Sequence, residues 1–98
     1  MITTKSGVKV ASSYQRIVSN EHPIHKGRYY EIDPSDIIRD GLYVPANQRW
    51  RRDSRMAYYN HVCTSDGAKL YHQKRTVSYA DYIVGMIYIS TEVSKELT

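Results

Sequence analysis

The chain has 98 residues, one cysteine and a net charge of +4, which fits a single domain with one modest core. A lone cysteine excludes an intramolecular disulfide scaffold, and the longest nearly apolar run, residues 82–89, is too short to cross a bilayer. The first seven residues contain no apolar stretch typical of a signal peptide. We therefore expect one cytoplasmic domain over residues 1–98, with a polar tail at 90–98 that frays and no membrane partner.

The first third of the chain predicts two strands separated by a short helix. Residues 1–11 alternate weakly between polar and apolar types and suit an edge strand. Ser12 or Ser13 is expected to cap a short helix that continues through Val18. After a loop, residues 28–32 alternate again and predict a second strand.

The clearest local signal is the start of a helix. Asp33 is a good N-cap residue, Pro34 suits the first helical position, and further acids follow in the first turn. Gly41 is expected to end this helix. We predict about two turns, with Ile37 and Ile38 facing inward. A short strand at 42–44 should follow.

The centre of the predicted sheet is a hairpin with strands 55–63 and 68–75. The pair Asp66-Gly67 favours a tight turn, because a type I′ turn needs positive φ at both central positions. A two-residue loop places residue 63 opposite 70, and a four-residue loop leaves the same residues on each face. One face then carries Ala57, Tyr59, His61, Cys63, Leu70 and His72. The other, a wet platform, carries Tyr58, Asn60, Val62, Lys69, Tyr71, Gln73 and Arg75.

The C-terminal apolar run admits two interpretations. Ser78–Asp81 approximates a capping box, and its cap and length favour a buried helix over residues 79–89. The many β-branched residues make a central strand the alternative. With the helix preferred, the expected fold class is α+β: a small twisted antiparallel sheet centred on the 55–63/68–75 hairpin, with one short and one C-terminal helix packed on it.

Positive charge is concentrated in one part of the sequence. The segment from Arg49 to Arg75 holds seven basic residues against two acidic ones, a net charge of +5, and the remaining residues carry −1. Ten of the eleven aromatic residues are tyrosines, which suit wet surfaces because the ring carries a polar tip. A concentrated positive field attracts anionic partners with an affinity that falls as salt rises.

These features predict a non-catalytic protein that binds nucleic acid, RNA or DNA, through an Arg/Tyr-rich hairpin surface. Arginines contact phosphates, and tyrosine rings stack on the bases of single strands. Trp50 is either part of this surface or an anchor in the core. The expected binding residues are Arg49, Trp50, Arg51, Arg52, Arg55, Tyr58, Lys69, Tyr71 and Arg75.

The same composition supports a protein-interaction module that binds an acidic protein surface. Tyrosine, tryptophan and arginine are enriched at the centres of protein interfaces. An inhibitor or adaptor of a nucleic-acid-handling machine is therefore the first alternative.

A small metal-independent ribonuclease is the second alternative. The predicted register sets His61 opposite His72, with Glu31 and Arg28 on a neighbouring strand, and such groups supply acid–base chemistry. The face that holds the histidine pair also holds Leu70, which favours a structural role instead.

Metal binding is not expected. His22 and His25 flank Pro23, which opposes a helix that would present both rings together. The remaining histidines and Cys63 do not match the spacing of a zinc site. We assign neither a metal nor a cofactor to this chain.

Overall fold

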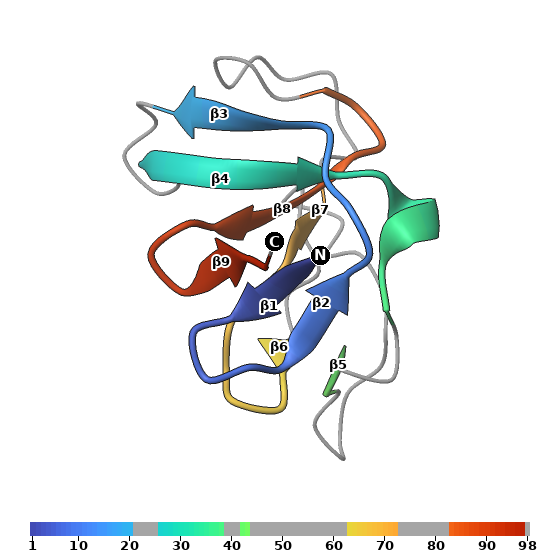
Figure 1. The fold of residues 1–98 in the computed structure, drawn as a ribbon. Coiled ribbons are helices and arrows are strands. Elements are labelled where there is room, and N and C mark those ends of the chain that lie inside the picture. Colours follow the sequence, from blue (N-terminus) through green and yellow to red (C-terminus); the bar gives the residue numbers. More distant parts are fainter. Residues whose placement is uncertain (21–25, 39–41, 44–62, 73–82, 98) are drawn as a thin grey trace.

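The computed structural model describes residues 1–20, 26–38, 42–43, 63–72 and 83–97. Within these ranges the chain forms nine strands and one 3₁₀ helix, without an α-helix (Figure 1). The strands build a three-stranded sheet, a four-stranded sheet and a two-stranded ladder, all antiparallel. The described fold is therefore mostly β, and the expected α+β class is wrong.

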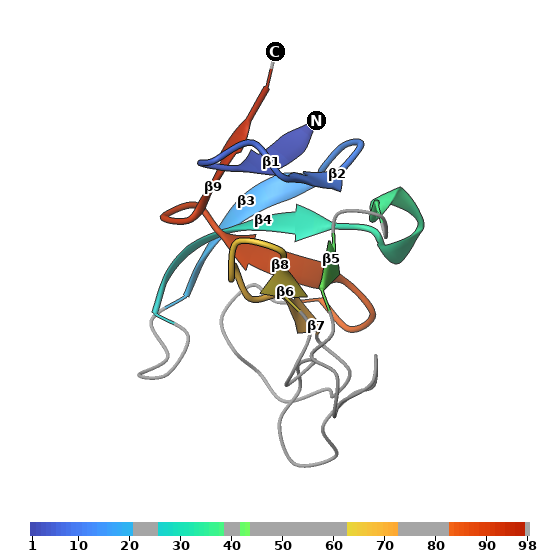
Figure 2. The ribbon, with the colours of Figure 1, turned by 90° about the horizontal axis from the view of Figure 1, so that it is seen from below.

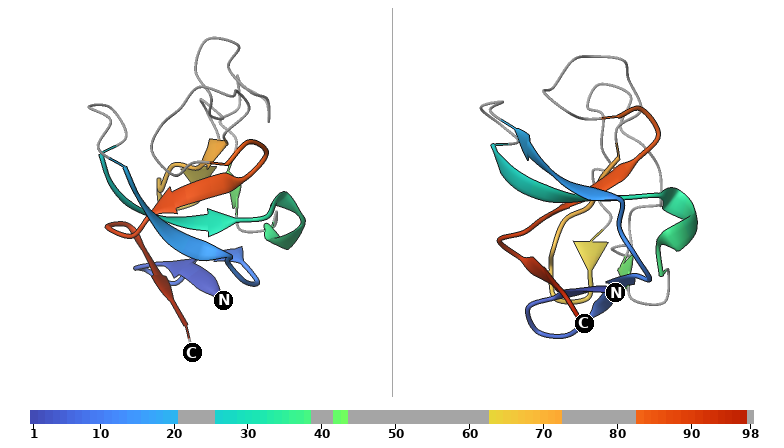
Figure 3. Two further views of the ribbon diagram at one scale, coloured as in Figure 1. Left: turned by 90° about the horizontal axis from the view of Figure 1, so that it is seen from above. Right: turned by 45° about the horizontal axis from the view of Figure 1, so that its top comes forward.

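The three-stranded sheet joins the two ends of the chain. Its central strand is β1 (Ile2–Thr4), with β2 (Lys9–Ala11) on one side and β9 (Ser94–Glu96) on the other. The N- and C-termini accordingly lie close together (Figures 1 and 3). Part of the polar tail at 90–98 thus belongs to a sheet.

The four-stranded sheet has the strand order β3-β4-β8-β7. Strands β3 (Arg16–Asn20) and β4 (Gly27–Ile32) form a hairpin, and β8 (Ile87–Ser90) pairs with β4. Strand β7 (Tyr71–His72) pairs with the far side of β8. Strand β4 confirms the strand predicted at 28–32.

The main core draws its members from β1 and β2 of one sheet and from β4 and β8 of the other, and Figures 2 and 3 show how these strands are arranged. Its buried members are Ile2, Val10, Ala11, Tyr30, Ile32, Ala68, Leu70, Ile87 and Ile89. Successive strand residues point to opposite faces, so the four-stranded sheet presents a second set of side chains on its other face. Val18, Tyr71 and Tyr88 are buried there as a second cluster. Both faces of this sheet therefore hold buried side chains.

The C-terminal helix predicted over residues 79–89 is wrong. Residues 87–90 form β8 instead, and Ile83–Met86 form a turn in which Gly85 has a φ of +94°. A strand buried on both faces is apolar without interruption, and its periodicity resembles that of a buried helix. The β-branched residues of this run were the more reliable signal.

The short helix predicted at residues 12–18 is also wrong. Arg16–Asn20 form β3, an edge strand among the described strands, in which Val18 faces the second cluster. Ile17 and Val18 are β-branched and adjacent, and such residues fit a pleated strand better than a helix. The two serines before them follow β2 without capping a helix.

The helix start at Asp33 is confirmed, but the helix is shorter than predicted. The Asp33 side chain accepts a hydrogen bond from the Ser35 amide at 2.9 Å, and Pro34 opens the 3₁₀ helix η1 (Pro34–Asp36). Ile37 is already extended, with a ψ of 131°, so the helix ends after three residues. Ile37 packs against the main core, as its predicted inward orientation requires.

The predicted hairpin turn forms, but with a loop of a different length. Cys63 bridges Lys69, so residues 65–67 form the loop, and Gly67 has a φ of +91°. The predicted register placed Cys63 opposite Leu70. The observed register differs by one residue, and a slip of one exchanges the two faces of a strand.

The strands beside this turn do not form the centre of the sheet. β6 (Cys63–Thr64) pairs with β5 (Leu42–Tyr43), which confirms a strand at 42–43, whereas β7 joins the four-stranded sheet. The predicted 55–63/68–75 hairpin is therefore wrong as the centre of the fold. Residues 55–62 and 73–75 lie outside the described residues.

Candidate functional site

Two of the nine residues predicted to bind nucleic acid or a protein, Lys69 and Tyr71, are described by the structure. The other seven lie outside the described residues, as does His61. Those seven are Arg49, Trp50, Arg51, Arg52, Arg55, Tyr58 and Arg75.

Lys69 is exposed to solvent, as the prediction requires. It follows the 65–67 loop, and its backbone bridges Cys63. The ammonium group is therefore carried on a short turn that is tied to the sheet, where it can reach an anionic partner.

Tyr71 does not belong to an exposed platform. Only 5% of the residue is accessible, and its ring lies 5.9 Å from the ring of Tyr88, between centroids, at an interplanar angle of 44°. Strand β7, which carries Tyr71, belongs to the four-stranded sheet, and its pairing with β8 places Tyr71 directly opposite Tyr88. A ring buried in this way offers no free face to a base, so this part of the predicted surface is wrong.

Tyr71 ends a row of side chains that crosses all four strands of the sheet. The register places Arg16 opposite Glu31, Glu31 opposite Tyr88, and Tyr88 opposite Tyr71. Residues that are directly opposite one another share a face. One face of the sheet therefore carries a cation, a carboxylate and two phenols in sequence.

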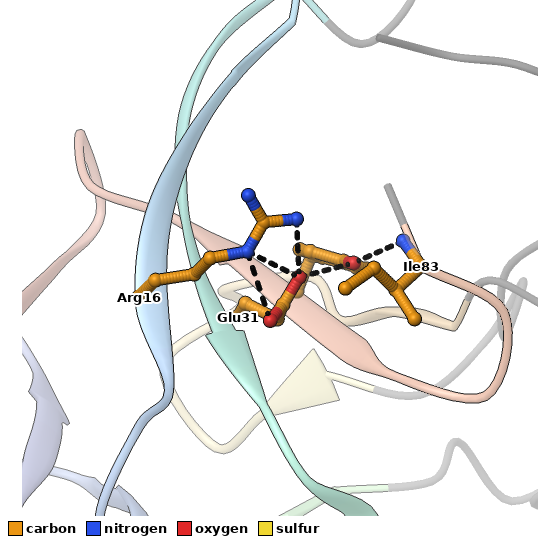
Figure 4. A network of polar contacts seen from close by, with 4 residues as sticks. Arg16, Glu31 and Ile83 are labelled. Atoms are coloured by element: carbon orange, nitrogen blue, oxygen red, sulfur yellow. Dashed lines mark hydrogen bonds and ion pairs between the residues drawn. The ribbon is translucent and has the colours of Figure 1, made fainter. Parts of the chain in front are cut away.

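A polar network connects three members of this row (Figure 4). Arg16 Nε lies 3.2 Å from each carboxylate oxygen of Glu31, and a terminal guanidinium nitrogen lies 3.1 Å from Oε2. The Tyr88 hydroxyl donates to Glu31 Oε2 at 2.8 Å and accepts the Ile83 amide at 2.7 Å. The network thus fastens the turn that begins at Ile83 to the middle of the sheet.

Burial differs strongly between the two charges of this network. The Glu31 side chain is 3% exposed and that of Arg16 is 42% exposed. Burial raises the pKa of the Tyr88 phenol, and its hydrogen bond to Glu31 acts in the same direction. Tyr88 therefore stays protonated and serves as a hydrogen-bond donor to Glu31.

The three ribonuclease candidates that the structure describes, Glu31, His72 and Arg28, do not come together. Glu31 shares a face with Tyr88, whereas His72 lies opposite Ile87 and so faces the main core. His72 is 3% exposed, and its Nε2 lies 3.1 Å from the carbonyl oxygen of Gly85, which can only accept, so Nε2 carries the proton. Arg28 is exposed and, three residues from Glu31, points to the opposite face.

A pocket of about 470 Å³ lies where three turns meet. Lys5, Asp66 and Glu92 supply its charged groups, and Ala68 and Val93 supply apolar lining. One cation and two carboxylates leave only a small net charge there. The pocket therefore favours no single class of ion.

Asp66 ties two of these turns together. It accepts hydrogen bonds from the hydroxyl groups of Ser6 and Thr64. The bond from Ser6, with those from Thr4 and Thr64, lowers the pKa of Asp66 to about 2. The carboxylate is thus ionised at neutral pH and anchors the 65–67 loop to the β1–β2 turn.

Neither a metal centre nor a membrane span is found in the described ranges. No group of three or more histidine, cysteine, aspartate or glutamate side chains that could hold a metal occurs there. His22 and His25 lie outside those ranges. Among the described residues, no helix has the length and apolar content needed to cross a membrane.

Comparison with known proteins identifies no relative of this chain. No protein-family pattern matches it, and neither curated proteins nor solved structures give a match.

Proposed function

We propose that this protein binds nucleic acid through its basic segment, Arg49 to Arg75, without catalysing a reaction on it. The observation that carries the proposal is the separation of charge along the chain. This segment has a net charge of +5, and the rest of the chain has −1. Phosphate contacts by clustered cations supply most of the affinity of non-specific binding.

The position of Lys69 supports this proposal, and that of Tyr71 restricts it. Lys69 belongs to the basic segment and is solvent-exposed, so its charge is available to a phosphate. Tyr71 is buried and cannot stack on a base. We therefore ascribe binding to ionic contacts with the backbone and assign no stacking role to Tyr71.

The described geometry favours binding over cleavage. A general acid and a general base must both reach the same phosphodiester. Glu31 and His72 are buried on opposite faces of one sheet, and Glu31 is already engaged by Arg16 and Tyr88. The chain has a single cysteine, Cys63, and so cannot form an intramolecular disulfide, which suits the reducing cytoplasm in which we place the protein.

The salt dependence of binding tests the proposal. We expect oligonucleotide binding to weaken linearly in log Kd against log salt, with a slope of about 0.7 to 0.9 per phosphate contact. Replacing Arg51, Arg52 and Arg55 together with glutamine should reduce that slope by about two to three. Fluorescence anisotropy with labelled duplex and single-stranded oligonucleotides, repeated at several salt concentrations, measures Kd and hence this slope.

A charge-matched variant controls for the loss of three positive charges. Lys9 and Lys95 lie on strands of the three-stranded sheet and Lys5 lies in the turn between β1 and β2; all three are exposed and outside the basic segment. Their joint replacement with glutamine should leave the slope nearly unchanged. Equal losses in the two triple variants, or no binding to any oligonucleotide at low salt, would contradict the proposal and favour an acidic protein partner.

A further inference from the structure

The pocket where three turns meet carries charges of both signs. Figure 1 shows the β1–β2 turn, the β6–β7 loop and the β8–β9 turn on one side of the molecule. Each of the three contributes one charged side chain, and these are Lys5, Asp66 and Glu92. Ala68 and Val93 add apolar lining. The volume of about 470 Å³ lies within the range of sites for small molecules.

The three charges of the pocket do not neutralise one another. Among the described residues the one ion pair joins Arg16 to Glu31, so Lys5 is paired with neither carboxylate of the pocket. Asp66 is engaged by hydroxyl groups, which leave its negative charge uncompensated. Each carboxylate oxygen has two lone pairs and can accept a second donor. The pocket therefore offers one cation and two anions to a ligand.

Hydrogen bonds between the turns hold the pocket in place. The Lys5 amide donates to the Val93 carbonyl at 3.2 Å and joins the β1–β2 turn to the β8–β9 turn. The Ser6 hydroxyl donates to Asp66 and joins the β1–β2 turn to the β6–β7 loop. The backbone of the site is thus formed in the free protein, and a ligand has to order only side chains.

We infer that this pocket binds a free amino acid with a cationic side chain, such as arginine. The ligand carboxylate pairs with Lys5, and the two ligand cations pair with Asp66 and Glu92. Its aliphatic stem packs against Val93 and Ala68. The charges match in number, because the ligand has one anion and two cations. A ligand with anions alone meets two carboxylates, and one with cations alone meets the Lys5 ammonium.

Amide NMR at constant ionic strength tests this binding without an oligonucleotide. The protein is titrated with arginine, with agmatine, which lacks the carboxylate, and with Nα-acetylarginine, which lacks the α-ammonium. We expect arginine to shift the amides of Lys5, Gly67 and Val93, with a Kd on the order of 1 mM for a ligand of this size. Each analogue should bind about fivefold more weakly, the upper end for one ion pair at a surface.

Two variants assign the charges of the ligand to residues of the pocket. Lys5→Gln should weaken arginine about fivefold and should not weaken agmatine, which has no carboxylate. Glu92→Gln should weaken both ligands. Asp66 is left intact because it anchors the β6–β7 loop. Lys9→Gln is the matched control, since Lys9 is an exposed lysine of β2 outside the pocket, and it should change neither affinity.

Three results would overturn the assignment. They are the absence of shifts around the pocket at millimolar arginine, equal affinity for arginine and either analogue, and equal effects of Lys5→Gln and Lys9→Gln. Equal affinity for Nα-acetylarginine would assign the pocket to the last residue of a peptide instead. Each of these results leaves the proposed nucleic-acid binding as it is, because no oligonucleotide takes part.

Discussion

Replacing Arg16 with methionine should destabilise the fold by about 2–3 kcal/mol, clearly more than replacing Glu31 with glutamine. Both changes remove the same ion pair. The difference arises from what each leaves behind. Without Arg16, an ionised carboxylate that is 3% exposed loses its counter-charge in a buried site. Without the Glu31 charge, the guanidinium is 42% exposed and regains water.

The Glu31→Gln variant should therefore lose only about 1 kcal/mol, because the amide oxygen still accepts from Tyr88. The double variant should be more stable than Arg16→Met alone, since no buried charge remains. Chemical denaturation of all four proteins completes a double-mutant cycle. Equal destabilisation by the two single changes would show that Glu31 is not buried as an ion in this network.

The second large effect is expected at Ile89. This side chain is fully buried in the main core, on β8 opposite Tyr30 of β4. Its replacement with alanine should cost about 3–4 kcal/mol, since it removes three carbons and leaves a cavity between the two sheets. For a domain of this size, the melting temperature should fall by roughly 12–30 °C.

Ile17 is the matched control for this change. It is the same residue type, it also lies opposite Tyr30, on β3, and it is 38% exposed at the edge of the described sheet. Its replacement with alanine should cost less than about 1 kcal/mol, because water fills the space. Urea denaturation measures both losses: the midpoint concentrations of the Ile17 and Ile89 variants can be compared directly if the m-value does not change. Similar losses at Ile17 and Ile89 would contradict packing of the three-stranded sheet on this face.

The parts of the fold that the sequence predicted are those with local causes. The strand at 28–32 follows from alternation, and the start of η1 follows from the capping geometry of Asp33 and Pro34. The turn at Gly67 follows from the need for positive φ. Each of these signals acts within a few residues and is independent of the rest of the chain.

The failed predictions concern elements that distant contacts decide. Strand β8 is covered on both faces, so its sequence lacks the alternation that identifies a strand. Tyr71 is buried because β7 pairs with β8, which sets Tyr71 opposite Tyr88, and this pairing joins strands far apart in sequence. For β8 the only local signal for a strand was its content of β-branched residues.

The buried network was equally inaccessible to sequence reasoning. The sequence predicts Glu31 on a strand and offers it as an acid–base candidate, but the Tyr88 hydroxyl that donates to it lies 57 residues away in sequence. Arg16 was assigned to a helix, and its position opposite Glu31 exists only once β3 and β4 pair. The only local sign of a buried polar network in the sequence is a glutamate, Glu31, that follows two tyrosines in a short alternating strand.

Amide NMR during titration with a duplex at low salt tests the nucleic-acid proposal most directly. We expect the largest chemical-shift changes at Lys69 and other residues of the Arg49–Arg75 segment. Amides of β1, β2 and β9 should remain near their free positions. Shifts confined to those three strands, or a spectrum that does not change at all, would contradict the account.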